Sequence, residues 1–216
     1  MNIGMKKLLI SSICFLVAIL GINAQSPIRW GVEAGLNLSK PTEATQTDCG
    51  FNVGVTGELG LSRGWFLDAA LKLTSQPWTI DSEYGIYEQP IIVKRHGSLT
   101  PYSLILPIHA GYSFGVGKAK IFAAVGPYIG YGLFGDGKIS DAEIENGVST
   151  GTTWNINNPY SQMKRFQVGG DARVGAELFG HYTIAVGYQF QLNNMMRSFN
   201  TSQKSQVFSI NLGYKF

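Results

Sequence analysis

The strongest constraint on this chain is an alternation of apolar and polar residues that recurs in eight stretches of about ten residues each. In the first stretch, every even-numbered position from Trp30 to Leu38 is apolar, whereas the odd-numbered positions carry Arg29, Glu33 and Asn37 together with glycines. Successive side chains of a β-strand point to opposite faces, so each stretch predicts a strand with one apolar face. A tilted strand needs about ten residues to cross the hydrocarbon layer of a membrane, whereas strands of soluble proteins are nearer five or six.

The connections between these stretches alternate between short and long. The predicted tight turns are Ser62–Gly64, Gly115–Lys118 and Phe179–His181. The long connections are Ser39–Gly50, Ser75–Ser98, Gly135–Arg165 and Asn193–Gln206. With an even strand count, this order puts both termini and the tight turns on one side and every long loop on the other, as in outer-membrane barrels. The predicted fold is therefore all-β: an eight-stranded antiparallel up-and-down transmembrane β-barrel.

The first residues have the order of a secretory signal peptide. Lys6 and Lys7 precede an apolar run that ends at Ile22, and Ala24 supplies the small residue before a cleavage site. The apolar run is shorter than the ~20 residues of a membrane-spanning helix, which argues against an N-terminal anchor. We expect residues 1–24 to be a cleaved signal peptide and residues 25–216 to form one barrel domain in a bacterial outer membrane.

Composition and charge exclude several other classes of protein. The chain has 27 glycines, 12% aromatic and 14% charged residues, which argues against a disordered or a helical protein. Without Lys6 and Lys7, 15 basic residues stand against 14 acidic ones, so the net charge is +1 and no nucleic acid partner is expected. Cys49 is the one cysteine after residue 24, so no intramolecular disulfide is expected.

Two closed barrels are compatible with the alternation: a soluble lipocalin-like ligand-binding barrel with its apolar face inward, and a membrane barrel with that face outward. The second face decides between them, because it is rich in glycine and has fewer charges than a soluble surface usually carries. Aromatic residues also form two belts, as the two interfaces of a bilayer select. The belt toward the tight turns comprises Trp30, Trp65, Phe114, Phe179, Tyr182, Tyr214 and Phe216. The belt toward the long loops comprises Phe51, Tyr102, Tyr131, Phe134, Phe166 and Phe190. These features favour the membrane barrel.

Several short motifs carry a resemblance to a known family. They are Asn23-Ala24-Gln25, Gly31–Leu38 (GVEAGLNL), Leu104–Pro107 (LILP), Gly126–Tyr131 (GPYIGY) and Gly213–Phe216. With these motifs, residues 25–216 resemble the porin-like, PorT-type outer-membrane barrel family, which shares its architecture with OmpA and OmpX. From the residues we expect a non-enzymatic outer-membrane protein with a structural or binding role, and the resemblance implies an accessory role in protein secretion or surface export.

The C-terminal residues match a pattern of the wider outer-membrane class. In that class, the barrel-assembly machinery reads an aromatic final residue that is preceded by apolar residues at every second position. Here the matching residues are Ile210, Leu212, Tyr214 and Phe216. A strand that ends at a lipid interface would show the same pattern, so the two interpretations are compatible.

The inward face carries a set of charges that forms the predicted lumen network. Its members are Glu33, Glu58, Asp68, Lys72, Asp171, Arg173, Glu177 and Lys215, with Arg29 close by in the pattern. Inside a narrow barrel, charges must pair or meet water, because an isolated buried ion is very costly. Two hypotheses remain open: a salt-bridged plug that closes the lumen, or a path for protons or ions.

We expect no catalytic, cofactor-binding or metal-binding residues. The best candidate for catalysis is His109 with Ser103 or Ser113, as in a barrel-embedded lipid-modifying hydrolase. Residues four or six positions apart on one strand lie too far apart to form a nucleophile–base pair directly. No metal-ligand spacing or phosphate-cradling loop stands in a credible setting.

The expected partners are outer-membrane lipid, the assembly machinery, and other proteins that contact the long loops. Two of those loops carry aromatic residues among charges, such as Trp78 and Trp154, which suits a binding surface. Loops that merely fold over the barrel mouth are the alternative. Pro107 and Pro127 conflict with the strand pattern, because proline cannot donate to a β-ladder, and we expect bulges to accommodate them.

Overall fold

The computed structural model describes residues 28–42, 44, 46–85, 91–145, 148–161, 163–195 and 203–216. Within these residues the strands are β1 (Ile28–Ser39), β2 (Asp48–Gly60), β3 (Trp65–Ser75), β4 (Trp78–Gly85), β5 (Ile91–Val116), β6 (Ala119–Glu145), β7 (Val148–Ile156), β8 (Phe166–Leu178), β9 (Tyr182–Gln191) and β10 (Gln206–Lys215). Two short 3-10 turns, η1 (Ser62–Gly64) and η2 (Pro159–Ser161), complete the described elements. No helix in this part of the chain is long and apolar enough to span a membrane. The predicted signal peptide, residues 1–24, lies outside the described residues and stays a prediction.

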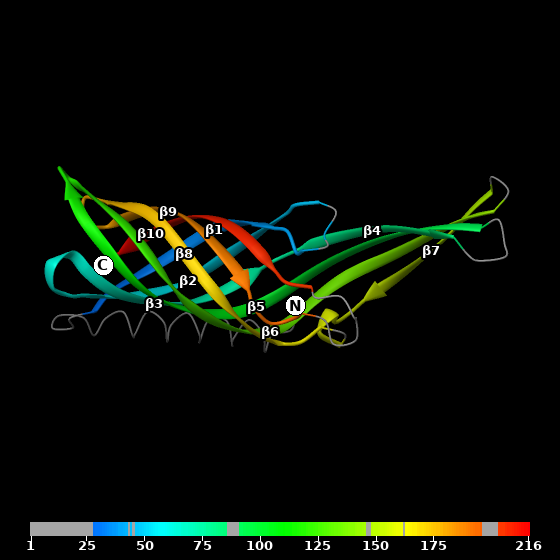
Figure 1. The fold of residues 1–216 in the computed structure, drawn as a ribbon, viewed down its shortest axis with the longest axis horizontal. Helices are drawn as coiled ribbons and strands as arrows, with labels where there is room; N and C mark the ends of the chain where they lie inside the picture. Colours follow the sequence, from blue (N-terminus) through cyan, green and yellow to red (C-terminus); the bar gives the residue numbers. More distant parts are fainter. Residues whose placement is uncertain are drawn as a thin grey trace, which may run out of the picture.

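Eight of the strands close into a ring. Each strand in the order β5-β3-β2-β1-β10-β9-β8-β6 pairs with its neighbour, and an additional pairing between β5 and β6 joins the ends of this series. All pairings are antiparallel. The tight turns lie at one end of the barrel, where the C-terminus also lies (Figure 1). Each tight turn contains a glycine with positive φ, namely Gly64, Gly117 and Gly180. The predicted all-β antiparallel barrel is confirmed.

The prediction that the two longest connections are loops is wrong, because both contain β-strands. The segments Ser75–Ser98 and Gly135–Arg165 contain β4, β7 and the outer halves of β5 and β6, in the order β4-β5-β6-β7. This four-stranded sheet, called the extended sheet below, projects from the barrel at the end opposite the tight turns (Figure 1). The apolar stripe that identifies the barrel strands stops here, since the outward positions of β5 change from Leu104 and Tyr102 to Ser98 and His96. The sequence pattern therefore missed these strands.

The apolar face of the barrel strands points outward, as predicted. Leu36 is 58% exposed and Leu71 is 45% exposed, whereas Glu33 and Asp68 on the other face are 8% and 4% exposed. A soluble ligand-binding barrel requires the reverse arrangement. The minority face of β6 also follows the barrel geometry, because Phe122 and Tyr128 are buried in the lumen.

Aromatic side chains lie at both ends of the outward surface. Toward the tight turns, the ring of Tyr214 lies 5.4 Å from that of Tyr182 and 5.5 Å from that of Phe216. Toward the extended sheet, the ring of Tyr102 lies 5.0 Å from that of Phe134 and 6.2 Å from that of Phe51. These positions are where a bilayer's two interfaces would meet the barrel.

The prolines are accommodated without the expected bulges. The ladder between β5 and β6 skips the residues between the pairs Pro107↔Tyr128 and Ala110↔Val125 and then resumes in the same register. Gly126 lies in this gap, and a Cβ there would come within 1.9 Å of the Ile108 carbonyl oxygen, so the two backbones approach closely. The register shift in this pair of strands lies elsewhere, next to Tyr102 and Ser103.

Candidate functional sites in the lumen and the extended sheet

A central ion cluster crosses the lumen between strands that are not neighbours. Arg173 on β8 forms ion pairs with Glu33 on β1, at 3.4 Å, and with Asp68 on β3. Lys72 on β3 also pairs with Glu33. The sequence placed these residues on the inward face, and the closure of the barrel brings them together.

His109 joins the same cluster. Its Nδ1 lies 2.8 Å from Asp68 Oδ1 and its Nε2 lies 2.7 Å from Asp171 Oδ1, and the side chain is 1% exposed. A neutral imidazole has one N–H, so it would turn a lone pair toward one of the carboxylates, whereas an imidazolium donates to both. Sequence reasoning missed the partners of His109, because the register of β3 against β5 cannot be read from either strand alone.

A second ion cluster lies toward the tight turns. Arg29 donates to Glu58 at 3.2 Å and to Glu177 at 3.0 Å, and Lys215 donates to Glu177 at 2.9 Å and also to Glu58. Lys120, which is more than half exposed, lies 3.6 Å from Glu177. The two clusters together contain all eight residues of the predicted network. Seven of them pair with a residue of opposite charge, and Asp171 contacts His109.

Apolar side chains fill the lumen around and above these clusters. Phe66, Phe122, Ala124 and Ala185 form a buried group inside the barrel. Trp78, Tyr160, Met163 and Met195 form a second group with Leu99, beside η2 and the start of the extended sheet. The cavity among the lumen charges measures about 20 Å³, which is room for about one water molecule. Among the described residues, the lumen thus has the character of a packed plug.

The His–Ser pairs considered for catalysis do not form. Ser103 Oγ lies 2.9 Å from Tyr160 Oη and accepts a hydrogen bond from Gln167 Nε2 at 2.9 Å. Ser113 Oγ donates to the Gly64 carbonyl at 3.2 Å. Both ring nitrogens of His109 face carboxylates, so neither is available to a serine hydroxyl. In the described part of the chain, no group of three or more His, Cys, Asp or Glu side chains is arranged to hold a metal ion.

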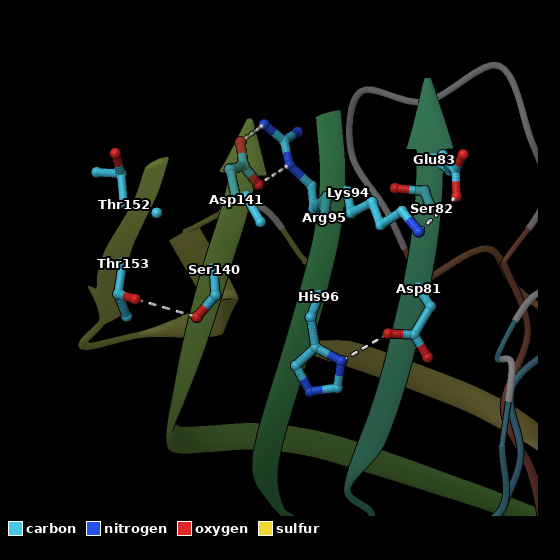
Figure 2. A pocket seen from close by; sticks show the side chains of 12 residues that line it. Asp81, Ser82, Glu83, Lys94, Arg95, His96, Ser140, Asp141, Thr152 and Thr153 are labelled. Atoms are coloured by element: carbon cyan, nitrogen blue, oxygen red, sulfur yellow. Dashed lines mark hydrogen bonds and ion pairs between the residues drawn. The ribbon is translucent and has the colours of Figure 1, made fainter. Parts of the chain in front are cut away.

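The outward face of the extended sheet carries a polar row across all four strands. Asp81, His96, Ser140 and Thr153 are register partners from β4 to β7. Figure 2 shows His96 Nδ1 bonded to Asp81 at 2.6 Å and Ser140 Oγ bonded to Thr153 Oγ1 at 3.2 Å. These residues line an open hollow of about 460 Å³. His96 and Asp81 are both more than half exposed, so the row is a wet surface.

One ion pair stands in the neighbouring row of the extended sheet. Arg95 donates from Nε to Asp141 Oδ1 at 2.7 Å and from Nη2 to the second carboxylate oxygen, a two-pronged contact (Figure 2). These hydrogen bonds from Arg95 hold the pKa of Asp141 below its usual value. The pair links β5 to β6 beyond the barrel, where solvent screens the charges.

The two edges of the extended sheet differ in protection. β4 and β7 are the terminal strands of the sheet order. β4 carries the charges of Asp81 and Glu83, whereas β7 (VSTGTTWNI) contains neither a charged residue nor a proline. Residues 150–155 of β7 are exposed. Natural edge strands are usually guarded by charges, prolines or bulges, so β7 is open to pairing with a further strand.

The predicted C-terminal insertion residues lie on the outward face of β10 and at its end. Ile210 is 45% exposed, Leu212 61%, Tyr214 37% and Phe216 52%. The Phe216 amide donates to the Trp30 carbonyl at 2.8 Å, which fixes the last residue against β1. The four side chains thus form one apolar stripe on the outside of the barrel.

A family model matches most of this chain, and several solved structures show similarity to it. A family model described as an outer membrane protein beta-barrel domain matches residues 23–197. Ail, the attachment invasion locus protein of Yersinia pestis, is 14% identical over 87% of this chain and 98% of Ail, with a TM-score of 0.38. Neisserial surface protein A is 12% identical over 88% of this chain and 98% of its own, with a TM-score of 0.40. The outer membrane enzyme PagL is 11% identical over 85% of this chain and 97% of its own, with a TM-score of 0.42. No curated protein matches the sequence significantly.

Proposed function

This chain belongs to the outer membrane protein β-barrel domain family, and on that premise we propose that it is a non-enzymatic binding protein of the bacterial outer membrane. The barrel anchors it in lipid, and the extended sheet engages a protein partner through the β7 edge. The observation that carries the proposal is the contrast between the charged edge strand β4 and the uncharged, exposed edge strand β7.

An edge strand of this kind suits β-strand addition. A partner that supplies an extended segment gains main-chain hydrogen bonds along the edge, and alternate side chains set the specificity. The barrel holds the outer halves of β5 and β6 in register, so the edge is presented on a preformed sheet. Preorganisation of this kind lowers the entropy cost of binding.

A structural or binding role also fits the lumen. Paired charges and buried aromatic groups occupy the interior, which leaves a cavity of about 20 Å³ among the charges. We expect no steady ionic current through the purified barrel in a planar bilayer. A stable open channel would contradict this part of the proposal.

The resemblance to PorT-type proteins supports a finer role, in which the partner belongs to a secretion or surface-export system. A polypeptide in transit, or a flexible arm of such a system, contains extended segments that could pair with the β7 edge. The outward stripe that ends at Phe216 supports recognition by the barrel-assembly machinery during biogenesis.

The test places a photocrosslinking amino acid at Thr152 on β7 in intact cells. Ser82 on β4 is the matched control, because both residues stand in the row of Arg95 and Asp141, one at each edge. We expect one discrete adduct from position 152, none from position 82, and loss of the adduct when Thr150→Lys guards the edge. Equal adducts from both edges, or an adduct that persists with Thr150→Lys, would reject the β7 edge as the binding site.

A further inference from the structure

A separate hollow lies on the outside of the barrel, at the level of the loop-side aromatic belt. Tyr131 on β6 and Phe166 on β8 are register partners, and their side chains are 53% and 57% exposed. Together with Lys164, Arg165 and Asn193 they line a space of about 520 Å³. Exposed aromatic rings in this position meet lipid where the hydrocarbon layer gives way to headgroups.

The segment that carries the two basic residues is fixed on both sides. The Lys164 amide donates to the Met195 carbonyl at 2.7 Å, and the Gly132 amide donates to the Arg165 carbonyl at 2.7 Å. Asn193 Nδ2 donates to the Phe166 carbonyl at 2.7 Å. The hollow is therefore built on a backbone that is tied to β6 and to the segment after β9.

The Arg165 guanidinium is held in place by contacts that use only part of its hydrogen-bond donors. Its Nη1 donates to the carbonyls of Gly132 and Leu133, each at 2.7 Å, and its Cζ lies 5.1 Å from the centre of the Tyr160 ring. Among the described residues, both hydrogen bonds of the guanidinium use Nη1, which leaves Nε and Nη2 for another acceptor. Arginine in this position combines a structural anchor with a charge that faces the lipid boundary.

No carboxylate within the described ranges forms an ion pair with Lys164 or Arg165. A cluster of positive charge without acidic partners in the described ranges attracts phosphate groups at a membrane surface.

We propose that this hollow binds the phosphate group of a lipid in the outer leaflet, with the acyl chains against Tyr131 and Phe166. Lys164 and the free donors of Arg165 contact the phosphate oxygens, and the Asn193 side chain borders the headgroup. A lipid is favoured over a free anion because two of the five lining residues, Tyr131 and Phe166, are exposed aromatic side chains that suit contact with acyl chains. The site is independent of the β7 edge, so its test does not depend on the proposed protein partner.

The experiment measures retention of bisphosphorylated lipid A by the full-length barrel, refolded in an uncharged detergent and examined by native mass spectrometry. We expect one tightly retained lipid A per barrel and at least about fivefold weaker retention of dephosphorylated lipid A. Phosphatidylglycerol in a third arm separates recognition of any phospholipid from recognition of a glycolipid phosphate. Inorganic phosphate in a fourth arm asks whether the site takes the anion alone.

Lys164→Gln is the diagnostic variant, because its backbone contacts do not use the side chain. We expect about fivefold weaker retention of lipid A. Lys118→Gln makes the same charge change in the tight turn between β5 and β6 and should leave retention unchanged. The electrophoretic shift of the folded barrel confirms folding of both variants.

Three results would overturn the proposal. The first is that the Lys164→Gln and Lys118→Gln variants retain lipid A equally well. The second is that the barrel retains dephosphorylated lipid A as tightly as lipid A. The third is that inorganic phosphate displaces lipid A when the two are at equal concentrations. Retention of phosphatidylglycerol to the same extent as lipid A supports a phosphate-reading lipid site, and exclusive retention of lipid A supports a site that also reads the glycolipid.

Discussion

The barrel and the extended sheet share the strands β5 and β6, yet apolar and charged side chains lie on different faces in the two regions. In the barrel, the outward face is apolar and the charges are buried in the lumen, as Val125 and Arg173 illustrate. In the extended sheet, the outward face is polar and its ion pairs are exposed, as His96 and Asp81 illustrate. The strand geometry is the same in both regions. The contribution of each side-chain interaction to stability therefore depends on whether lipid or water surrounds it.

The largest expected difference between the two regions concerns arginine pairs. Arg173→Met leaves the buried carboxylates of Glu33 and Asp68 short of a partner, so we expect a loss of about 3–5 kcal/mol in the free energy of unfolding. Arg95→Met removes the contact with Asp141, in which the Arg95 side chain is 44% exposed, and should cost clearly less than Arg173→Met. Urea unfolding in detergent, followed by tryptophan fluorescence, measures both. A similar cost for the two variants would mean that the lumen is hydrated rather than packed.

The second-largest expected difference concerns charges placed on the outward face of β6. Val125→Arg puts a charge on the lipid-facing side of β6, where we expect a cost of about 2–4 kcal/mol. Ser140→Arg makes a comparable change on the same strand in the extended sheet and should be close to neutral. The two free energies of unfolding in lipid vesicles test the boundary between lipid and water on β6. If Val125→Arg left the free energy of unfolding unchanged, the outward face of β6 would not contact lipid.

Histidines separate the two regions on a smaller scale. His109→Gln removes the ring that contacts Asp68 and Asp171 at the same time, and we expect a cost of about 1.5–3 kcal/mol, since hydrogen bonds to charged groups are worth that much. His96→Gln in the extended sheet should cost less than about 1 kcal/mol. Lipid A composition and phospholipid turnover should be unchanged in cells that carry His109→Gln. Altered lipid turnover would revive the lipid-hydrolase hypothesis.

The smallest expected effect is a pH dependence confined to the extended sheet. Because Arg95 lowers the pKa of folded Asp141, their contact stabilises the sheet at neutral pH, and this contribution is lost as the pH falls through the lowered pKa. Limited proteolysis of the folded barrel at decreasing pH should show cleavage in residues 135–156 before the barrel itself is cut. The variant Asp141→Asn should be equally sensitive at neutral and acidic pH. Acid-induced cleavage that is the same in this variant would assign the effect to another group.

The outcome of the sequence predictions follows the same division. The eight barrel strands were predictable because lipid contact on one face imposes apolar residues at every second position, as from Trp65 to Leu73 on β3. β4 and β7 were missed because water on the outward face of the extended sheet removes that pattern, as at His96 and Ser140. The sequence also showed that Pro107 and Pro127 conflict with a regular ladder, but not that a local gap without a change of register accommodates them.

The eight lumen residues could be assigned to the inward face, but their partners could not. Glu33, Asp68 and Arg173 come from β1, β3 and β8, and β8 pairs with neither of the other two strands. His109 was examined as a base for a serine, whereas the fold sets it between two carboxylates. The basic hollow at Lys164 gave no signal in the sequence, because its lining comes from β6, the start of β8 and the segment after β9.

By itself, the sequence determined which side of each barrel strand faces lipid, because the direction of a side chain in a strand depends only on whether its position is odd or even. The tertiary structure alone decided which inward charges meet, how β5 and β6 continue into a sheet outside the barrel, and which edge of that sheet stays open. These features depend on the register and stagger between strands, which closure of the whole ring fixes and no single strand encodes.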